Sequence, residues 1–216
     1  HKGAISGTIK FTGDKPEART LQMGTSDPIC AGAHADTPAL DERFIVNDDM
    51  TLPNVFVYIK KGPAGFDFAA PTDRNFTVSQ KGCLYIPHVF GVMKGEEFSV
   101  QNDDATLHNV KITSKRNGTH NKSQTEGKSD SWTFDKKETA IPFACDVHKW
   151  MGAWAFVLDH PFFAVTGTDG KFSLAGVPDG EYELVAWHET FASGKGKSVN
   201  VTVAGGAIVQ DFELSK

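Results

Sequence analysis

Short runs of alternating apolar and polar residues recur along this chain, and no long stretch repeats apolar residues at the 3.6-residue period of a helix. Alternation with period two places successive side chains on opposite faces of a strand. Glycine, proline, asparagine or aspartate bounds each run, as at turns between strands. The runs are residues 4–11, 54–60, 76–78, 97–100, 109–112, 153–158, 171–174, 181–186, 198–203 and 207–214. Many short strands at this spacing predict an all-β protein of one or two sandwiches.

Two segments lack this alternation. Residues 23–43 are rich in aspartate, alanine, glycine and proline, which favours a long loop with room for one helical turn. Residues 115–131 are polar and carry no apolar periodicity. We therefore expect a mobile surface loop there.

The charge pattern argues against two classes of partner. The net charge is −5, and the lysine pairs 60–61 and 136–137 are too short for a nucleic-acid patch. No apolar run has the length of a membrane span, so we expect none. The chain begins at His1 without methionine, which fits a removed leader or the remnant of a tag.

The chemically informative residues are Cys145, His148 and Met151, spaced as Cys-x-x-His-x-x-Met, with His108 upstream. A strand that delivers Cys145 and a tight turn after it can bring the other two side chains to the same metal ion, with His108 on a neighbouring strand. A thiolate and two imidazoles in one plane, with a weak axial thioether, are the ligands of a type 1 copper centre. The sequence therefore predicts one copper ion that cycles between Cu(I) and Cu(II).

Other sites fit this pattern less well. Zinc prefers a fourth strong ligand to an axial thioether. A binuclear copper centre needs two bridging thiolates, and this loop offers only Cys145. A nucleophilic Cys–His pair does not require Met151.

The three cysteines are Cys30, Cys83 and Cys145. One disulfide plus one functional thiolate is the simplest division of an odd number. With Cys145 assigned to the metal, we expect a Cys30–Cys83 disulfide and an oxidising, extracytoplasmic location such as the periplasm. Three reduced thiols in a cytosolic protein remain the alternative.

Residues 77–160 resemble a cupredoxin domain. The strand at 95–103 is similar to the family's K-G-x-x-V-x-W-x-N strand, and residues 108–110 match its H-N-V motif. The short ligand loop is similar to that of amicyanin. The resemblance implies a Greek-key sandwich, outer-sphere transfer of single electrons and a backbone amide from Asn109 to the sulfur of Cys145.

The resemblance also implies where a redox partner docks. In cupredoxins the second histidine ligand reaches the surface through an apolar patch, so we expect His148 to be the electron port and Trp150 to line the docking site. Lys149 stands where short-loop relatives often have proline, which would either loosen the loop or alter the choice of partner. The partner is expected to be a redox protein of unknown identity.

The two ends of the chain resemble a carboxypeptidase regulatory-like, or transthyretin-like, β-sandwich. The resemblance is carried by the strand at 4–11, where the family has an opening Gly-x-Val strand, and by the D-G-x-F-x-L and P-x-G-x-Y-x-L hairpin at 169–184. The implied organisation is a sandwich of residues 1–70 and 161–216, with a cupredoxin domain of residues 71–160 inserted into it or packed on it. The disulfide would then join the two domains.

Three further histidines bear on function. His88 is expected to be structural, because the ligand set is complete without it, and His34 either lies near the disulfide or is an exposed loop residue. We predict an electron-transfer protein and no enzyme. One alternative is a copper carrier or storage protein without a redox partner. The other is a copper oxygenase that uses His1 as a ligand.

Overall fold

A computed structural model describes residues 3–24 and 27–216 of the chain. Strands dominate these residues, and the regular helices are one α-helical segment of six residues, α1 (Pro28–Ala33), and short 3-10 turns at Glu42–Phe44 and Ala192–Gly194. The expected all-β class is therefore confirmed. Among the described residues no helix is long and apolar enough to cross a membrane.

The chain forms two compact units. Unit 1 comprises His1–Arg19, Asp41–Phe68 and Pro161–Lys216, and unit 2 comprises Thr20–Leu40 and Ala69–His160. Residues 20–40 thus belong to unit 2, whereas the sequence analysis assigned them to the sandwich of residues 1–70 and 161–216. Their place follows from burial, since Met23 and Cys30 lie in the hydrophobic core of unit 2.

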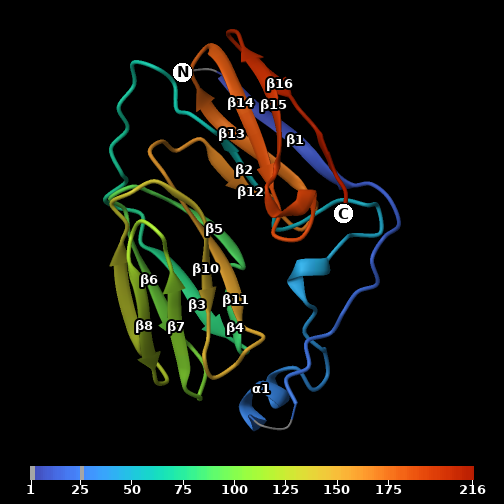
Figure 1. Cartoon of the computed structure of the whole chain (residues 1–216), viewed down its shortest axis with the longest axis vertical. Helices are drawn as coiled ribbons and strands as arrows, with labels where there is room; N and C mark the ends of the chain where they lie inside the picture. The colour runs from blue at the N-terminus through green and yellow to red at the C-terminus, as the bar shows by residue number, and fades with distance from the viewer. Residues whose placement is uncertain (1–2, 25–26) are drawn as a thin grey trace. The chain divides into compact units, whose positions relative to one another are not determined.

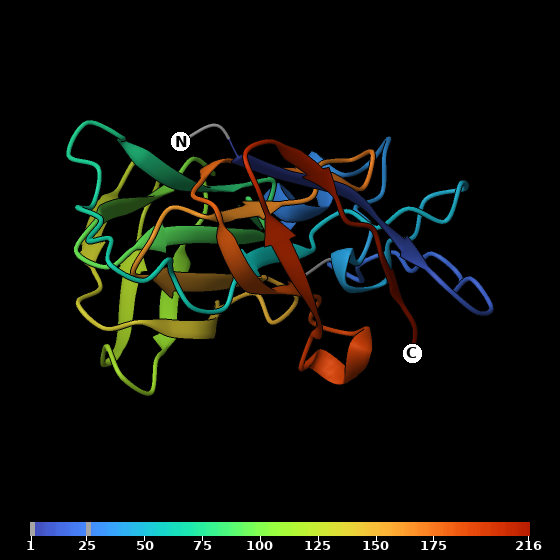
Figure 2. The ribbon, with the colours of Figure 1, turned by 90° about the horizontal axis from the view of Figure 1, so that it is seen from above.

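Unit 1 is a sandwich of two sheets. One sheet is centred on β1 (Gly3–Phe11), which pairs antiparallel with β13 (Lys171–Val177) and parallel with β16 (Ala207–Val209) and β17 (Phe212–Leu214). In Figures 1 and 2 the red C-terminal strands run beside the blue β1. The other sheet has the order β12 (Phe163–Val165), β2 (Phe56–Ile59), β14 (Gly180–Trp187) and β15 (Lys197–Val203). Inward side chains of both sheets share one core, including Ile5, Ile59, Leu174, Leu184 and Phe212.

The expected strand at 207–214 is divided into β16 and β17. The division falls at Gln210, whose backbone N–H donates to the carbonyl of Ser6 (2.8 Å) and whose own carbonyl lies against Gly7. A Cβ atom at Gly7 would stand 2.0 Å from that carbonyl oxygen, so this approach requires glycine.

Unit 2 also has two sheets. The first has the order β5 (Val89–Met93), β11 (Gly152–Leu158), β10 (Glu138–Ala144), β7 (His108–Thr113) and β8 (Thr119–Gln124). The second has the order β4 (Leu84–Ile86), β3 (Phe76–Lys81), β6 (Glu97–Asn102) and β9 (Ser129–Thr133). The strands β7, β10 and β11 are neighbours, with Ala144 of β10 opposite Lys111 of β7 and Gly152 of β11.

The expectation of a mobile loop at 115–131 is wrong. This segment contains β8, which pairs with β7, and the start of β9, which pairs with β6. Each is the last strand of its sheet, and nearly every side chain of β8 is exposed or half-buried. An edge strand with two wet faces shows no alternation, so hydrophobic periodicity could not detect it.

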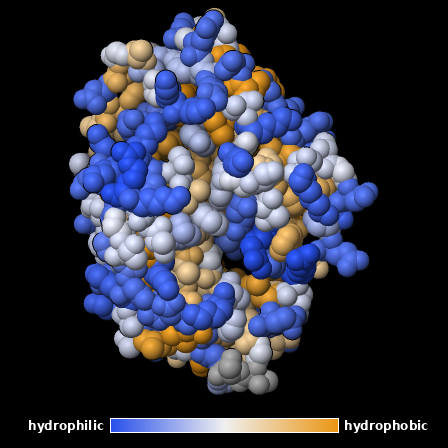
Figure 3. Space-filling model, in the orientation of Figure 1, coloured by the Kyte–Doolittle hydropathy of each residue, from blue (hydrophilic) through white to orange (hydrophobic). Residues whose placement is uncertain are grey.

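The surface in Figure 3 is mostly hydrophilic, with apolar side chains in separate patches on the face in view. Inside unit 2, aromatic rings fill much of the core. The ring of Phe98 lies 5.1 to 6.4 Å from the rings of Phe90, Trp132, Phe134 and Phe143. It therefore joins strands of both sheets.

We predict that Phe98→Ala lowers the free energy of unfolding by about 3–5 kcal/mol, because it removes a ring that is 1% exposed and leaves a cavity. Denaturant unfolding followed by near-UV circular dichroism measures the change. Leu40→Ala is the control, since Leu40 is 42% exposed and should change stability by no more than about 0.5 kcal/mol. Equal losses in the two variants would contradict the assignment of Phe98 to the core.

Candidate metal centre

Neighbouring strands deliver the four predicted ligands to one end of unit 2. His108 is the first residue of β7, Cys145 follows the last residue of β10, and Met151 precedes the first residue of β11. His148 lies in the turn between β10 and β11, which is closed by a hydrogen bond from the Met151 N–H to the His148 carbonyl (3.0 Å). Since β10 pairs with both β7 and β11, the fold brings these sequence-distant positions together.

Three of the predicted ligands form a compact, buried group. The Nδ1 atoms of His108 and His148 are 2.9 Å apart, and the Sγ atom of Cys145 lies with them in a cluster whose ligand atoms are all within 4.8 Å of one another. His108, Cys145 and His148 are 0%, 2% and 3% exposed. Met151 is 2% exposed and belongs to the same core as Cys145.

Two backbone N–H groups donate to the sulfur of Cys145. The N–H of Asn109 lies 3.2 Å from Sγ and the N–H of His148 lies 3.4 Å from it. The predicted contact of Asn109 is therefore confirmed. Two donors aimed at one sulfur stabilise negative charge on it, and a thiolate is the form of cysteine that binds metals.

Tyr85 links the two ligand-bearing strands behind the sulfur. Its hydroxyl lies 2.5 Å from the carbonyl oxygen of Asn109 and 3.0 Å from that of Ala144. Burial raises the pKa of Tyr85, so the hydroxyl remains a donor at neutral pH. The starts of β7 and the ligand loop are thus held together by a side chain from the other sheet.

The outer nitrogen of His108 meets a carboxylate. Its Nε2 lies 2.9 Å from Oδ2 of Asp104, and the Asp104 carboxylate also accepts the backbone N–H groups of Gly82 and Cys83, each at 2.7 Å. We infer that Nε2 carries the proton, which leaves the Nδ1 lone pair facing His148. Burial lowers the pKa of His108, and the Asp104 contact opposes that shift.

The outer nitrogen of His148 meets a second carboxylate. Its Nε2 lies 3.0 Å from Oδ2 of Asp27 and 3.5 Å from Sγ of Cys30. The expectation that His148 is exposed at the surface is therefore wrong, because the segment around α1 covers its outer edge. Sequence reasoning missed this cover. The Asp-Pro pair at 27–28 signals a helix start, yet no pattern in the sequence relates it to a histidine 121 residues later.

Asp27 is held in place by four hydrogen bonds. As the N-cap of α1, its Oδ1 accepts the N–H groups of Ile29 (2.9 Å) and Cys30 (3.3 Å). Its Oδ2 accepts the Thr106 hydroxyl (2.6 Å) as well as the His148 ring. The Thr106 hydrogen bond contributes most to lowering the pKa of Asp27 to about 2.

The disulfide lies where the sequence predicts it. Cys30 and Cys83 are joined with an S–S distance of 2.01 Å across 53 residues. Both belong to unit 2, so the bond does not join the two units as expected. It ties α1 to the start of β4, and the Nε2 of His34 supports this connection by lying 2.7 Å from the carbonyl oxygen of Gly82.

The remaining predicted residues lie around the centre. Trp150 is half-buried, with its ring centroid 5.1 Å from that of His148 and its Nε1 donating to the Cys83 carbonyl (3.1 Å). Lys149 is exposed and lies 3.4 Å from Asp146. His88 is buried, with Nδ1 3.0 Å from the Gly152 carbonyl, which agrees with a structural role. His1 lies outside the described residues.

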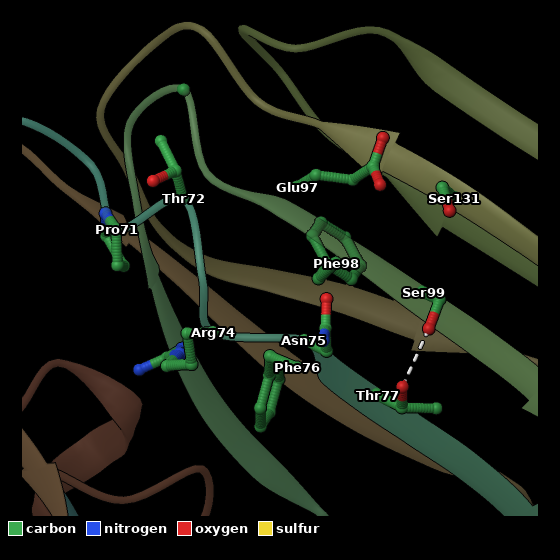
Figure 4. Close-up of a pocket in the computed structure, with 11 residues that line it drawn as sticks. Pro71, Thr72, Arg74, Asn75, Phe76, Thr77, Glu97, Phe98, Ser99 and Ser131 are labelled. Carbon is green, nitrogen blue, oxygen red and sulfur yellow. Dashed lines mark hydrogen bonds between the residues drawn. The ribbon is translucent and has the colours of Figure 1, made fainter.

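A separate depression of about 330 Å³ lies elsewhere on unit 2 (Figure 4). Residues near the starts of β3 and β6 line it, and Thr77 and Ser99 share a hydrogen bond of 2.8 Å there. The guanidinium of Arg74, at its edge, is engaged with buried Glu96 at 2.6 Å. None of the predicted site residues lines this depression.

Three solved structures are similar to part of this chain: a copper-containing nitrite reductase, an amicyanin variant and a purple cupredoxin. A copper-containing nitrite reductase from Thermus scotoductus has 17% identity and a TM-score of 0.38, over 46% of this chain and 25% of the reductase. A variant of amicyanin in its reduced Cu(I) form has 23% identity and a TM-score of 0.36, over 47% of this chain and 97% of amicyanin. A purple cupredoxin from Nitrosopumilus maritimus has 16% identity and a TM-score of 0.34, over 38% and 99%.

No protein-family model matches the chain, and no curated protein matches it. The chain spans about a quarter of the length of the nitrite reductase.

We predict one free thiol per chain when the oxidised protein is denatured without reductant, and three after reduction. The reason is that Cys30 and Cys83 are paired and Cys145 is free. Thiol titration measures both numbers. The double variant Cys30→Ser, Cys83→Ser should lose about 4 kcal/mol of stability by the loop-entropy relation. Three thiols without reductant would contradict the pairing.

Proposed function

We propose that this chain binds one copper ion through His108, Cys145 and His148, with Met151 as the axial ligand, and transfers single electrons outside the cytoplasm. The observation that carries the proposal is the pair of Nδ1 atoms 2.9 Å apart beside the Cys145 sulfur. When bound, copper supplies a reversible one-electron change between Cu(I) and Cu(II).

The donor set fits a soft to borderline metal ion. Both outer nitrogens face carboxylates, so two Nδ1 lone pairs point at each other inside the protein. Such a pair needs a cation between the two nitrogens, either a shared proton or a metal ion. The thiolate, two imidazoles and a buried thioether favour copper over zinc.

Rigidity suits the proposed function. The hydrogen bonds of Asn109 to Cys145, of Tyr85 to both strands and of Asp104 to His108 fix the ligands without help from the metal. A site held in this way changes little when the charge of its ion changes, which favours rapid electron transfer.

We retain Trp150 and Lys149 as the proposed docking residues, with a change in how they act. Because His148 is covered, the path to a partner would lead through the half-buried ring of Trp150 beside it. Leu107 and Val147, next to the two histidine ligands in sequence, are 44% and 47% exposed and add apolar surface. Small apolar surfaces suit brief redox encounters.

The proposal also covers the fold family of unit 1 and the cellular location of the protein. We infer that unit 1 is a carboxypeptidase regulatory-like sandwich, supported by its two sheets around one core and by the turns that precede β13 and β14. We infer an extracytoplasmic location, supported by the disulfide.

A copper carrier without a redox partner is the alternative. The burial of both imidazoles argues against ready transfer of the ion to a carrier's target. A strong Cu(I) chelator distinguishes the two functions, because a carrier should lose its copper within the time that an electron-transfer protein retains it.

We expect an intense visible absorption from the Cys145 thiolate in the Cu(II) protein, which disappears on reduction and returns on oxidation. Cys145→Ser should abolish it. The zinc-loaded protein, which has no such transition, is the spectral control. A colourless Cu(II) protein, or a band that survives in Cys145→Ser, would refute the proposed centre.

The role of Met151 can be tested separately. Met151→Leu should raise the reduction potential, because it removes the weak thioether donor that stabilises Cu(II). Met151→Gln should lower the potential, because an amide oxygen is a harder donor and stabilises Cu(II) more. Both variants should still bind copper. Voltammetry measures the shifts, with Met93→Leu as a control in the same unit. Identical potentials in all four proteins would show that Met151 is not the axial ligand.

A further inference from the structure

Asp27 covers the outer edge of the His148 ring. Its Oδ2 lies 3.0 Å from Nε2 of the ring, and Cys30 of α1 adds its sulfur at 3.5 Å. The Asp27 side chain itself is 15% exposed, so it lies between the ring and solvent. The ring's outer edge is thus closed by groups from a segment more than 100 positions away in sequence.

The position of Asp27 does not depend on the histidine. Its other oxygen caps α1, Thr106 holds Oδ2 at 2.6 Å, and the disulfide three residues later fixes α1 to the sheet. A helix cap needs only one carboxylate oxygen. The second oxygen is therefore free to serve the metal ligand, and Thr106, two residues before His108, aims it.

Asp27 and Asp104 have matching relations to the two imidazoles. One oxygen of each carboxylate lies 2.9 to 3.0 Å from an Nε2 atom, and each side chain also accepts two backbone N–H groups, Asp27 through its other oxygen and Asp104 through both. A carboxylate behind a ligand histidine fixes the ring orientation and tautomer and makes the ring a stronger donor.

We propose that Asp27 is a positioning residue of the copper centre, which holds His148 with its Nδ1 toward the metal and favours Cu(II) over Cu(I). This inference rests on the proposed copper function. The physical basis is electrostatic. A carboxylate close to the centre stabilises Cu(II) more than Cu(I), because Cu(II) carries the higher charge.

The test compares Asp27→Asn with Asp36→Asn. The first keeps an oxygen to cap α1 and removes the charge beside His148. The second removes one charge from an exposed position of the same segment and is the matched control. For Asp27→Asn we expect the Kd for Cu(II) to rise about 10- to 100-fold, which is the range typical when the hydrogen-bond partner of a metal-binding histidine is removed. The Kd for Cu(I) should rise by less.

The reduction potential is the readout that a purely structural cap would not move. A tenfold change in the ratio of the Cu(II) Kd to the Cu(I) Kd corresponds to about 59 mV for a one-electron couple, so the potential of Asp27→Asn should rise by that amount for each tenfold increase in the ratio. Asp36→Asn should match the parent protein. An unchanged ratio in Asp27→Asn, with the visible band intact, would reduce Asp27 to a helix cap and overturn the inference.

A copper-free measurement separates this inference from the proposed function. Nitrogen-15 NMR of the metal-free protein should show a slowly exchanging Nε2–H on His148, which becomes fast in Asp27→Ala and stays slow in Asp36→Asn. Thr106→Val, which keeps the helix cap, should give an intermediate exchange rate. If the parent protein forms no coloured copper centre, the proposed function fails. If the Nε2–H of the parent exchanges freely, the positioning role of Asp27 fails.

Discussion

The contact between the imidazoles of His108 and His148 is the constraint around which unit 2 is arranged. Their Nδ1 atoms lie 2.9 Å apart and their Nε2 atoms each meet a carboxylate, which gives the continuous line Asp104, His108, His148, Asp27 through the protein. Two lone pairs at that distance repel each other unless a cation separates them, so the fold must supply the force that keeps the rings in place. It does so through backbone donors to both carboxylates, which belong to α1 and to the turn before β4.

The two sheets of unit 2 make this line possible. The strands β7, β10 and β11 are neighbours in one sheet, so their ends deliver His108, Cys145 and Met151 to the same edge. The aromatic core around Phe98 joins this sheet to the other, and Tyr85 reaches from β4 to the carbonyl groups of both ligand-bearing strands. A packed core resists small displacements, so ligand positions set by strand ends vary little with the state of the site.

Much of this arrangement could be predicted from residue types, their spacing and the resemblance to a known family. The grouping of His108, Cys145 and His148, the amide of Asn109 and the pairing of Cys30 with Cys83 agree with the geometry of the structure. The cover on His148 could not be predicted, because Asp27 acts through tertiary placement and its local signal is only that of a helix cap. The strands in 119–133 were missed for a different reason, since edge strands exposed on both faces carry no hydrophobic period.

The formal charges indicate how the two carboxylates would act on the proposed copper centre. In the proposed copper centre, the Cys145 thiolate and the carboxylates of Asp27 and Asp104 would carry three negative charges, which would leave one net negative charge with Cu(II) and two with Cu(I). Burying a charge in a protein costs free energy, and the cost is larger when fewer opposite charges and hydrogen bonds compensate it. Enclosure therefore penalises the reduced state more than the oxidised one. Hydrogen bonds from Thr106 and from backbone N–H groups disperse part of that charge. Asp27, which shields His148 from solvent, would thus also shift the balance between the two oxidation states of the proposed copper centre.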